Sequence, residues 1–330
     1  MRDGDTTSTI RAAITQALAD AMESDERVFC IGEDIADPMG GSYKVTAGLS
    51  TRFGEARVRN TPISEGAIVG AAIGAALAGM RPVAEIMYGD FLTVAMDQVV
   101  NQAAFLSYMS GGQLSVPIVI RCQGGAWRGS AAQHSKSLEA WFAHVPGLKY
   151  VMPTTVQDAY DMMRWAIQDP DPVIFYESNL LYGNKGPLSV SNPDALPTGS
   201  VIRRPGKHAT LVAWGMTVAM AVKAAEVLYA GQGIDVEVIE VRTLAPLDLS
   251  VIEDSVKKTG LLAIAHEAWT RGGLGGEIAA SISSSCFHYL DGPIRRIGAL
   301  NCPHPFSPPL EEAMLPSEAQ VVRTIQEWFE

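Results

Sequence analysis

The sequence predicts an α/β protein built from two doubly wound domains, and three observations carry this prediction. Short runs rich in Val, Ile and aromatic residues alternate with amphipathic helical patterns, which is typical of parallel strands joined by crossover helices. This alternation occurs twice, on either side of a stretch rich in Gly, Pro, Ser and Asn. The chain has 330 residues, which is enough for two domains of about 150 residues each.

The first domain is expected to span residues 1–178 and to open with an amphipathic helix that Thr7 or Ser8 can cap. One face of this helix carries Ile10, Ala13, Ile14, Ala17, Leu18, Ala21 and Met22 at helical spacing. Strands are expected after it at residues 28–31, 82–86, 116–121, 149–152 and 172–177, and residues 58–63 are also strand-like. Residues 179–207 keep no apolar period and are predicted to be the linker.

The second domain, residues 208–330, repeats the pattern. Its strands are expected at residues 209–214, 235–241, 261–266 and 293–297, with helices at residues 217–229, 249–258 and 275–284. A last helix opens at Ser317 with Gln320 three positions on, which is a capping-box pattern, and is expected to run to the end of the sequence.

Composition excludes several classes of protein. Apolar residues make up 47% and charged residues 18%, so the chain is neither disordered nor fibrous. So large an apolar share favours an oligomer that buries surface between subunits. The net charge of −11, without a Lys/Arg cluster, argues against nucleic acid as a partner. The longest apolar run, residues 67–80, is shorter than the about 20 residues that a membrane span needs.

The compartment is predicted from the cysteines and the first residues. Cys30, Cys122, Cys286 and Cys302 are scattered, so neither a disulfide framework nor a zinc site is indicated. Residues 1–9 are polar and lack the apolar core of a signal peptide. We therefore expect a cytoplasmic protein.

The glycines do not form a nucleotide-binding fingerprint. Neither G-x-G-x-x-G nor G-x-x-x-x-G-K-[ST] occurs at a strand-to-helix turn, and the glycine-rich residues 272–276 are interpreted as a structural turn. Gly66, Gly70 and Gly74 line one face of a predicted helix, so another helix can approach closely there. Contact across a subunit interface and packing within the domain both explain this face.

Two ionisable residues are candidates for chemistry. Glu65 directly precedes the glycine-lined helix, where burial would raise the pKa of its carboxyl and suit it to acid–base catalysis. The alternative is a glutamate at a helix start that accepts backbone N–H groups. His134 lies in a Gly- and Ser-rich stretch after a predicted strand, where a loop residue can face a ligand. The alternative for it is a hydrogen-bonded surface histidine.

Nine short strings closely resemble one family over essentially the whole chain. They are GED at 32–34, TPISE at 61–65, RPVAE at 81–85, YMSGGQ at 108–113, VPIV at 116–119, QHS at 133–135, HVPGLK at 144–149, VRTLAPLD at 241–248 and HEA at 266–268. The family is the β subunit of the thiamine-diphosphate-dependent component of 2-oxo acid dehydrogenase complexes, including pyruvate and acetoin dehydrogenases. The resemblance implies a pyrimidine-binding domain followed by a transketolase-like C-terminal domain.

The resemblance also implies roles for individual residues. Glu65 matches the glutamate that hydrogen-bonds the pyrimidine ring of the cofactor and so favours an imino tautomer that acts as a base. His134 matches the histidine that orders the covalent intermediate and assists acyl transfer to the lipoyl arm. Ile63, Met87 and Phe91 match the walls of the aminopyrimidine pocket, although the intervening Tyr88-Gly89-Asp90 is less typical of the family. In some members main-chain carbonyls hold potassium, and the matching residues here are Ile118, Ala166, Asp169 and Asp171.

One absent motif indicates a partner. Thiamine diphosphate needs magnesium and a diphosphate cradle, which this superfamily supplies through Gly-Asp-Gly, and no such string occurs in the sequence. We therefore expect an α subunit to supply that half of the site, in an α2β2 heterotetramer within a multienzyme complex. A lipoyl acyltransferase core would accept the acyl group and dock on the C-terminal domain.

The favoured function is therefore oxidative decarboxylation of pyruvate with acyl transfer to lipoamide. Acetoin and branched-chain 2-oxo acids stay open as substrates, because the acyl pocket is shared with a second chain. Half of a split transketolase would need more His and Arg for sugar phosphates than residues 121–136 offer. A non-catalytic assembly subunit is the alternative outside the enzymes, and the presence of both Glu65 and His134 argues against it.

Overall fold

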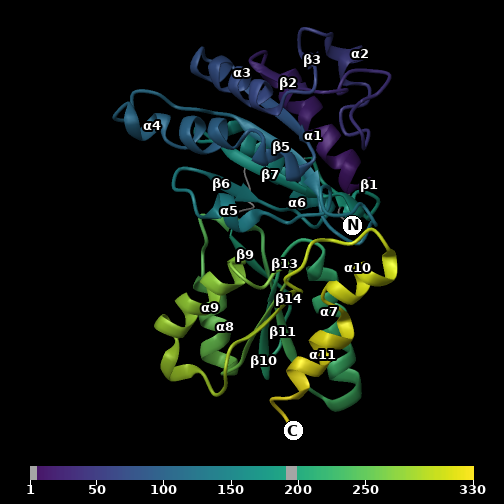
Figure 1. Ribbon diagram of the computed structural model, residues 1–330, viewed down its shortest axis with the longest axis vertical. Helices are drawn as coiled ribbons and strands as arrows, with labels where there is room; N and C mark the ends of the chain where they lie inside the picture. The colour runs from purple at the N-terminus through teal and green to yellow at the C-terminus, as the bar shows by residue number, and fades with distance from the viewer. Residues whose placement is uncertain (1–5, 191–198) are drawn as a thin grey trace. The chain divides into compact units, whose positions relative to one another are not determined.

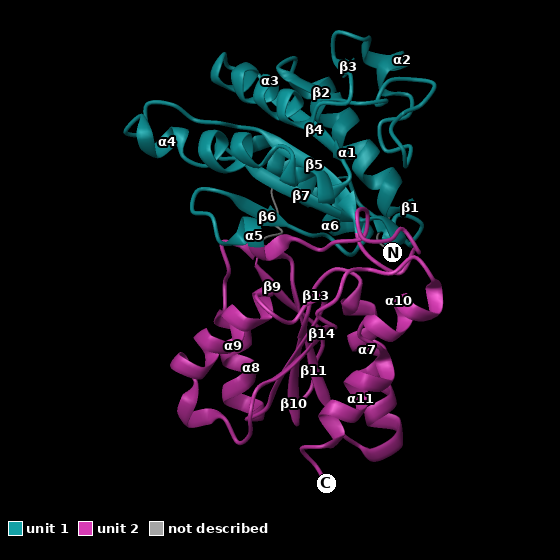
Figure 2. Ribbon diagram, in the orientation of Figure 1, with its two compact units in different colours: residues 1–124, 141–198 teal, residues 125–140, 199–330 magenta. Residues whose placement is uncertain are grey.

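The computed structural model describes residues 6–190 and 199–330 and divides the chain into two compact units (Figures 1 and 2). Unit 1 comprises Met1–Gly124 and Trp141–Thr198, and unit 2 comprises Gly125–Ala140 and Gly199–Glu330. The residues outside this description include the start of the polar N-terminal stretch and residues 191–198 of the predicted linker. The predicted domain limits place residues 125–140 in the first domain, whereas in the structure these residues belong to unit 2.

Unit 1 contains a parallel sheet formed by the predicted strands, which lie side by side in the order β6-β7-β5-β4-β2-β3. Its strands are β2 (Val28–Gly32), β3 (Val58–Asn60), β4 (Arg81–Met87), β5 (Val119–Gly124), β6 (Lys149–Val151) and β7 (Val173–Ser178). The predicted third strand begins three residues late, at Val119, because the Ile118 N–H bonds to the Val116 carbonyl in a tight turn.

Helices of unit 1 pack on this sheet and on each other. They are α1 (Ile10–Ser24), α2 (Leu49–Phe53), α3 (Glu65–Leu77), α4 (Leu106–Met109) and α6 (Val156–Gln168), with the 3-10 helices η1 (Gly89–Thr93) and η3 (Asn179–Leu181) and the π-helix η2 (Gln98–Ala103). The helix α5 (Glu139–Ala143) begins in unit 2, and its residues from Trp141 on belong to unit 1. The α1 helix packs against α6, and α3 packs against β4 and η2. The predicted apolar face of α1 is buried throughout, from Ile10 to Met22.

The predicted cap of the first helix is wrong. Thr7 and Ser8 lie in a short strand, β1 (Thr6–Thr9), and the Thr9 side chain caps α1 by accepting the Ala12 N–H at 3.2 Å. The strand forms because β1 pairs antiparallel with β8 (Lys185–Leu188), a segment within the range predicted as linker. Pairing between such distant residues leaves no local pattern from which the cap could be read.

A buried ion cluster joins three strands of the unit 1 sheet. Arg121 on β5 makes a two-pronged ion pair with Glu177 on β7, at 2.5 Å for Nε to Oε1 and 2.7 Å for Nη2 to Oε2. Its Nη1 also contacts Glu85 on β4, and the Tyr182 hydroxyl donates to Glu177. All three charged side chains are almost fully buried, so each depends on the others for the solvation that water no longer provides.

Unit 2 is a second α/β layer structure with the strand order β14-β13-β10-β11-β9. The strands are β9 (Ser200–Arg204), β10 (Ala209–Ala213), β11 (Val236–Val241), β13 (Leu262–Trp269) and β14 (Arg295–Ala299); β9 is antiparallel to β11 and the other pairs are parallel. The remaining elements are α7 (Thr217–Gln232), β12 (Thr243–Ala245), α8 (Ser250–Thr259), α9 (Leu274–Ser285), η4 (Phe287–Tyr289), α10 (Pro308–Met314) and α11 (Glu318–Gln326). Figure 1 shows α7 and α11 on one side of this sheet and α8 and α9 on the other.

The cap of the last helix is confirmed, since the Ser317 side chain accepts the Gln320 N–H at 3.2 Å. The helix ends at Gln326 rather than at the end of the sequence. Within the described part of the chain, no helix combines the length and the apolar character needed to cross a membrane.

Candidate active site

The carboxyl ends of β2, β3 and β4 bring the residues matched to the aminopyrimidine pocket to one edge of the unit 1 sheet, whereas the residues matched to a potassium site do not follow these strands. Because neighbouring parallel strands end on the same side, the residues after β2, β3 and β4 meet there. Glu33 follows β2, Glu65 opens α3 shortly after β3, and Met87 is the last residue of β4. The α3 helix starts at Glu65, and its N-cap Ser64 has a non-helical backbone (φ −165°, ψ 83°) and makes no side-chain capping hydrogen bond.

Glu65 is half-buried, and a second carboxyl shares its surroundings. Burial raises the pKa of Glu33, and the negative charges of Glu65, Asp34 and Glu85 raise it further. Among the described residues nothing donates a hydrogen bond to Glu33 Oε2, although that atom is buried. This edge of the sheet therefore has a buried carboxylate oxygen that a protonated ring nitrogen or an amino group could satisfy.

Glu33 is not among the site residues predicted from the sequence, where it appears only as part of the GED string at 32–34. A signal for it existed, because a carboxyl that directly follows a fully buried strand lies at the edge where α/β proteins bind ligands. Its partnership with Glu65 depends on the pairing of β2 with β3, and the sequence does not specify that pairing.

The three predicted pocket walls differ in exposure. Met87 and Phe91 are half-buried, and the Met87 sulfur accepts a hydrogen bond from the Ser42 hydroxyl. Ile63, in contrast, is 77% exposed. An aliphatic side chain this exposed gains from burial only when a further group covers it.

The glycine-lined face of α3 resolves into two parts. A Cβ on Gly70 would lie 3.2 Å from Gln98 Oε1, and one on Gly66 would lie 3.8 Å from the Val94 carbonyl oxygen, so both glycines pack within unit 1. Around Gly74, by contrast, no described atom lies within 4 Å of a built Cβ. Packing inside the unit therefore explains Gly66 and Gly70 but leaves Gly74 open.

His134 belongs to unit 2, in the segment of residues 125–140 that follows β5. The backbone of this segment is held in unusual conformations, with positive φ at Trp127 (62°) and Ala131 (61°). Such conformations cost free energy in residues other than glycine and are concentrated at functional sites. His134 itself is half-buried, which fits a side chain that faces a ligand better than a fully exposed one.

Unit 2 also contains buried ionisable residues for which the sequence predicted no role. Glu267 is 1% exposed, and burial raises the pKa of its carboxyl to about 7. Glu139 is equally buried, its pKa is also raised by burial, and it accepts the Trp214 indole N–H at 3.0 Å. His266 stacks on Trp214 with ring centroids 5.0 Å apart, and burial lowers its pKa to about 4.

The packing of His266 explains the glycine-rich turn at residues 272–276. A Cβ on Gly273 would lie 3.0 Å from His266 Cε1, and one on Gly275 would lie 2.8 Å from Nε2. Gly272 has a φ of +67°, which a residue with a side chain rarely adopts. The glycines thus make room for a buried imidazole and allow the turn between β13 and α9.

The four residues matched to a potassium site lie in unit 1, and several of their oxygen atoms already contact other groups of the protein. The Ile118 carbonyl accepts the Val173 N–H at 2.9 Å, and the Asp169 carbonyl lies 3.4 Å from Arg81 Nη1. The Lys149 ammonium contacts the Asp169 carboxylate at 2.6 Å and the Asp171 carboxylate at 3.0 Å. Carbonyl oxygens keep a second lone pair, so a cation can still bind, but Arg81 and Lys149 already supply positive charge.

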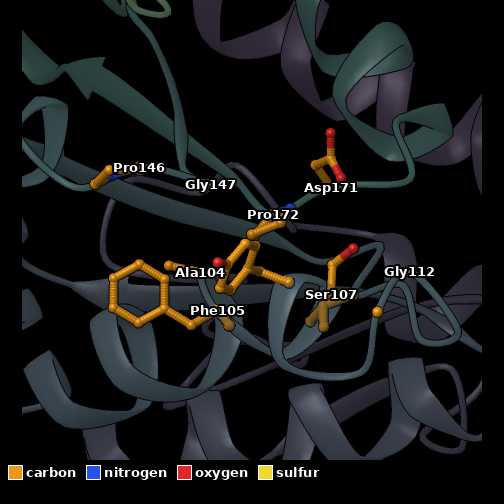
Figure 3. Close-up of a pocket in the computed structure, with 12 residues that line it drawn as sticks. Ala104, Phe105, Ser107, Gly112, Pro146, Gly147, Asp171 and Pro172 are labelled. Atoms are coloured by element: carbon orange, nitrogen blue, oxygen red, sulfur yellow. The ribbon is translucent and has the colours of Figure 1, made fainter.

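A separate cavity of about 710 Å³ lies in unit 1 beside α4 (Figure 3). Its lining is mainly apolar and consists of Ala103, Ala104, Phe105, Ser107, Tyr108, Gly111, Gly112, Val116, Pro146, Gly147, Asp171 and Pro172. Of the predicted site residues, Asp171 is part of this lining, whereas Glu65, Met87 and Phe91 are not.

Comparison with family models gives two matches. Residues 6–185 match the pyrimidine binding domain of transketolase, and residues 199–321 match the transketolase C-terminal domain. Among solved structures, a split-gene transketolase described as an inactive β4 tetramer has a TM-score of 0.78 at 23% identity, covering 96% of this chain and 97% of that one. Transketolase from Leishmania mexicana has a TM-score of 0.71 at 17% identity, covering 98% of this chain and 45% of that one. These likenesses confirm the predicted fold class.

Several curated proteins are similar over almost the whole chain. The pyruvate dehydrogenase E1 component subunit beta of Rhizobium meliloti is 45% identical over 97% of this chain and 69% of its own length. The mitochondrial beta-2 subunit from rice is 43% identical, covering 96% of this chain and 84% of its own. The corresponding protein of Rickettsia bellii is 41% identical, covering 96% of this chain and 97% of its own.

Proposed function

Because the chain belongs to the transketolase-like family that includes the β subunits of pyruvate dehydrogenase, we propose that it is the β subunit of a thiamine-diphosphate-dependent 2-oxo acid dehydrogenase. Pyruvate is the favoured substrate. The observation that carries this proposal is the 45% identity to a pyruvate dehydrogenase E1 β subunit over 97% of the chain. Acetoin and branched-chain 2-oxo acids are the alternative substrates.

Glu65 is the residue that we propose holds the pyrimidine of the cofactor. Its carboxylate lies at the start of α3, half-buried and beside the carboxyl of Glu33. Two acidic groups at one place favour a proton on a ring nitrogen bound between them. Met87, Phe91 and Ile63 would flank the ring, and the exposure of Ile63 would end once cofactor and partner cover it. When bound, thiamine diphosphate supplies the carbon nucleophile and the electron sink for decarboxylation.

The cofactor's diphosphate and magnesium are assigned to an α subunit. The sequence has no Gly-Asp-Gly string, and the described residues hold no cluster of His, Cys, Asp or Glu that could bind a metal ion. We therefore propose an α2β2 heterotetramer with the cofactor between the two kinds of chain. A lipoyl acyltransferase core is the proposed acyl acceptor, and His134 would assist transfer of the acyl group to the lipoyl arm.

The test is reconstitution with a co-expressed candidate α subunit. Pyruvate, a branched-chain 2-oxo acid and acetoin are each offered with an artificial electron acceptor, and turnover of pyruvate is the expected result. Glu65→Gln should lower that rate by about 100-fold or more while leaving the tetramer intact, because a proton-holding carboxyl is lost. Glu26→Gln, an exposed carboxyl of the same unit, is the matched control.

Two outcomes would overturn parts of this proposal. Full activity of Glu65→Gln would refute the role of that carboxyl. Cofactor binding and full turnover by the α subunit alone would select the assembly-subunit alternative.

A potassium ion at the carbonyls of Ile118, Ala166, Asp169 and Asp171 is a secondary proposal that rests on family resemblance. It predicts a higher melting temperature in potassium chloride than in sodium chloride at equal ionic strength, and equal values would refute it.

A cytoplasmic location is likewise our proposal. Its support is that the cysteines are unpaired and that three of them are buried, which suits a reducing compartment.

A further inference from the structure

The segment of residues 125–140, which carries His134, is fixed to unit 2 at several points. Ala126 packs in an apolar cluster with Ala299, Met314 and Leu315. The Gly129 N–H donates to Glu311 Oε2 at 2.8 Å, beside the strained backbone of Trp127 and Ala131. These contacts hold the beginning of the segment, on the N-terminal side of His134.

The other end of the segment is held by two buried acids. Three residues after His134, the Ser137 hydroxyl donates to Glu267 Oε1 on β13, and both residues are buried. Glu139 accepts the indole N–H of Trp214, which lies directly after β10. His134 therefore lies between an anchor at Gly129 and an anchor at Ser137, with a half-buried side chain of its own.

Packing alone does not account for Glu267. Burying a carboxyl costs free energy unless hydrogen bonds repay it, and Glu267 Oε2 has no hydrogen-bond partner among the described residues. An apolar residue of the same size would fill the space without that cost. The hydrogen bond that the carboxyl does make is the one to the segment carrying His134.

We propose that Glu267, through its hydrogen bond with Ser137, is a positioning residue for His134 in the acyl-transfer half of the reaction. This inference rests on the proposed function, because it assigns His134 to that step. Glu267 acts through the segment, and the bond to Ser137 restricts where the imidazole three residues earlier can lie. Two neighbouring groups affect the pKa of the Glu267 carboxyl: the negative charge of Glu139 raises it, and the hydrogen bond from Ser137 lowers it.

The experiment uses the reconstituted α2β2 enzyme and a matched pair of substitutions. Glu267→Gln keeps an oxygen that can accept the Ser137 hydroxyl, whereas Glu267→Met removes it at nearly the same size. Ser137→Ala removes the donor from the other side. Glu312→Gln, an exposed carboxyl of unit 2, is the control.

Two rates are measured for each variant: acyl transfer to a free lipoyl domain, and decarboxylation with an artificial acceptor. We expect Glu267→Met and Ser137→Ala to lower acyl transfer by about tenfold, the order of a lost hydrogen bond to a charged or strongly polar group, with a much smaller effect on decarboxylation. Glu267→Gln should retain most of the transfer rate. A purely structural role would lower both rates together and would not distinguish Gln from Met.

Hydrogen exchange of the full-length chain gives a readout that does not depend on activity. Amides of residues 125–140 should exchange about tenfold faster in Glu267→Met and Ser137→Ala than in Glu267→Gln and Glu312→Gln. Unchanged exchange, or an active enzyme whose variants lower both rates equally, overturns the inference. A wild-type enzyme inactive on every substrate, with the expected exchange pattern, would refute the proposed function and leave the anchoring by Glu267 standing.

Discussion

Replacing Glu267 with glutamine should stabilise the protein at alkaline pH and have little effect in acid. The carboxyl has a pKa of about 7 in the folded chain against 4.5 for an unperturbed glutamate. Below pH 4.5 the carboxyl is protonated in both states and contributes no difference. Between pH 4.5 and 7 the folded protein keeps a proton that the unfolded chain has released, so the free energy of unfolding falls as pH rises. Above pH 7 the loss is complete and amounts to about 3 kcal/mol.

The Gln variant lacks this titration, so the difference in unfolding free energy between variant and wild type should grow from near zero at pH 4.5 to about 3 kcal/mol at pH 8. Urea unfolding of the full-length chain at half-unit pH steps measures it, with Glu312→Gln as the control. The pH dependence of the unfolding free energy of the wild type alone does not isolate the contribution of Glu267, because a second buried group titrates in the same range. His266, whose pKa falls from 6.5 to about 4, contributes stability that is lost as pH falls through this range, which opposes the trend of Glu267. A variant no more stable than wild type at pH 8 would refute the reasoning.

Three further substitutions test the packing. Arg121→Met should destabilise unit 1 by about 3–5 kcal/mol in urea unfolding, because Glu85 and Glu177 then lack their counter-ion, and adding Glu85→Gln and Glu177→Gln should recover most of the loss. Gly147→Ala should lower the free energy of unfolding by at least about 2 kcal/mol, since φ is +90° and the added Cβ would lie 2.2 Å from the Ala104 carbonyl oxygen. Gly74→Ala should raise it by up to about 1 kcal/mol in the isolated chain, because the helix gains propensity and the Cβ meets open space; a loss in that variant would contradict the open environment.

The sequence was sufficient for the elements whose signal is local. The apolar face of α1 and the Ser317 cap of α11 are confirmed because helical spacing and capping act within a few residues. Apart from β9 and β12, the strands of the two sheets were predicted for the same reason. Strands β8 and β9 were missed because they lie among Gly and Pro, and they form through pairing with β1 and β11. The Thr9 cap was missed with β8, since the β1 pairing fixes where α1 begins.

The candidate site divides in the same way. Glu65 and His134 could be selected because each lies beside a recognisable helix start or loop. Glu33 lies near Glu65 because β2 pairs with β3, and Arg121 meets its two glutamates because β4, β5 and β7 are neighbours in the sheet. Neither arrangement can be predicted from local sequence. The Ser137–Glu267 hydrogen bond joins residues 130 positions apart, so no spacing rule could indicate it. Local patterns therefore select candidate ligand-contacting residues more readily than the buried residues whose contacts come from distant parts of the chain.

The exposed face of α3 is a reason to expect a second chain around Glu65. Every residue of this helix after Glu65 is Gly, Ala, Val, Ile or Leu, and such a helix is normally buried on all sides. Yet Ala67, Ala71, Gly74 and Leu77 are exposed, and Ile63 precedes the helix at 77% exposure. The apolar side chains of this face are removed from water only if another surface covers them, and their burial is what the hydrophobic effect favours. If the α subunit is that surface, Gly74→Ala should weaken assembly with α while stabilising the isolated chain, and sedimentation of the mixed subunits measures the difference. Unchanged assembly would show that the partner covers a different face.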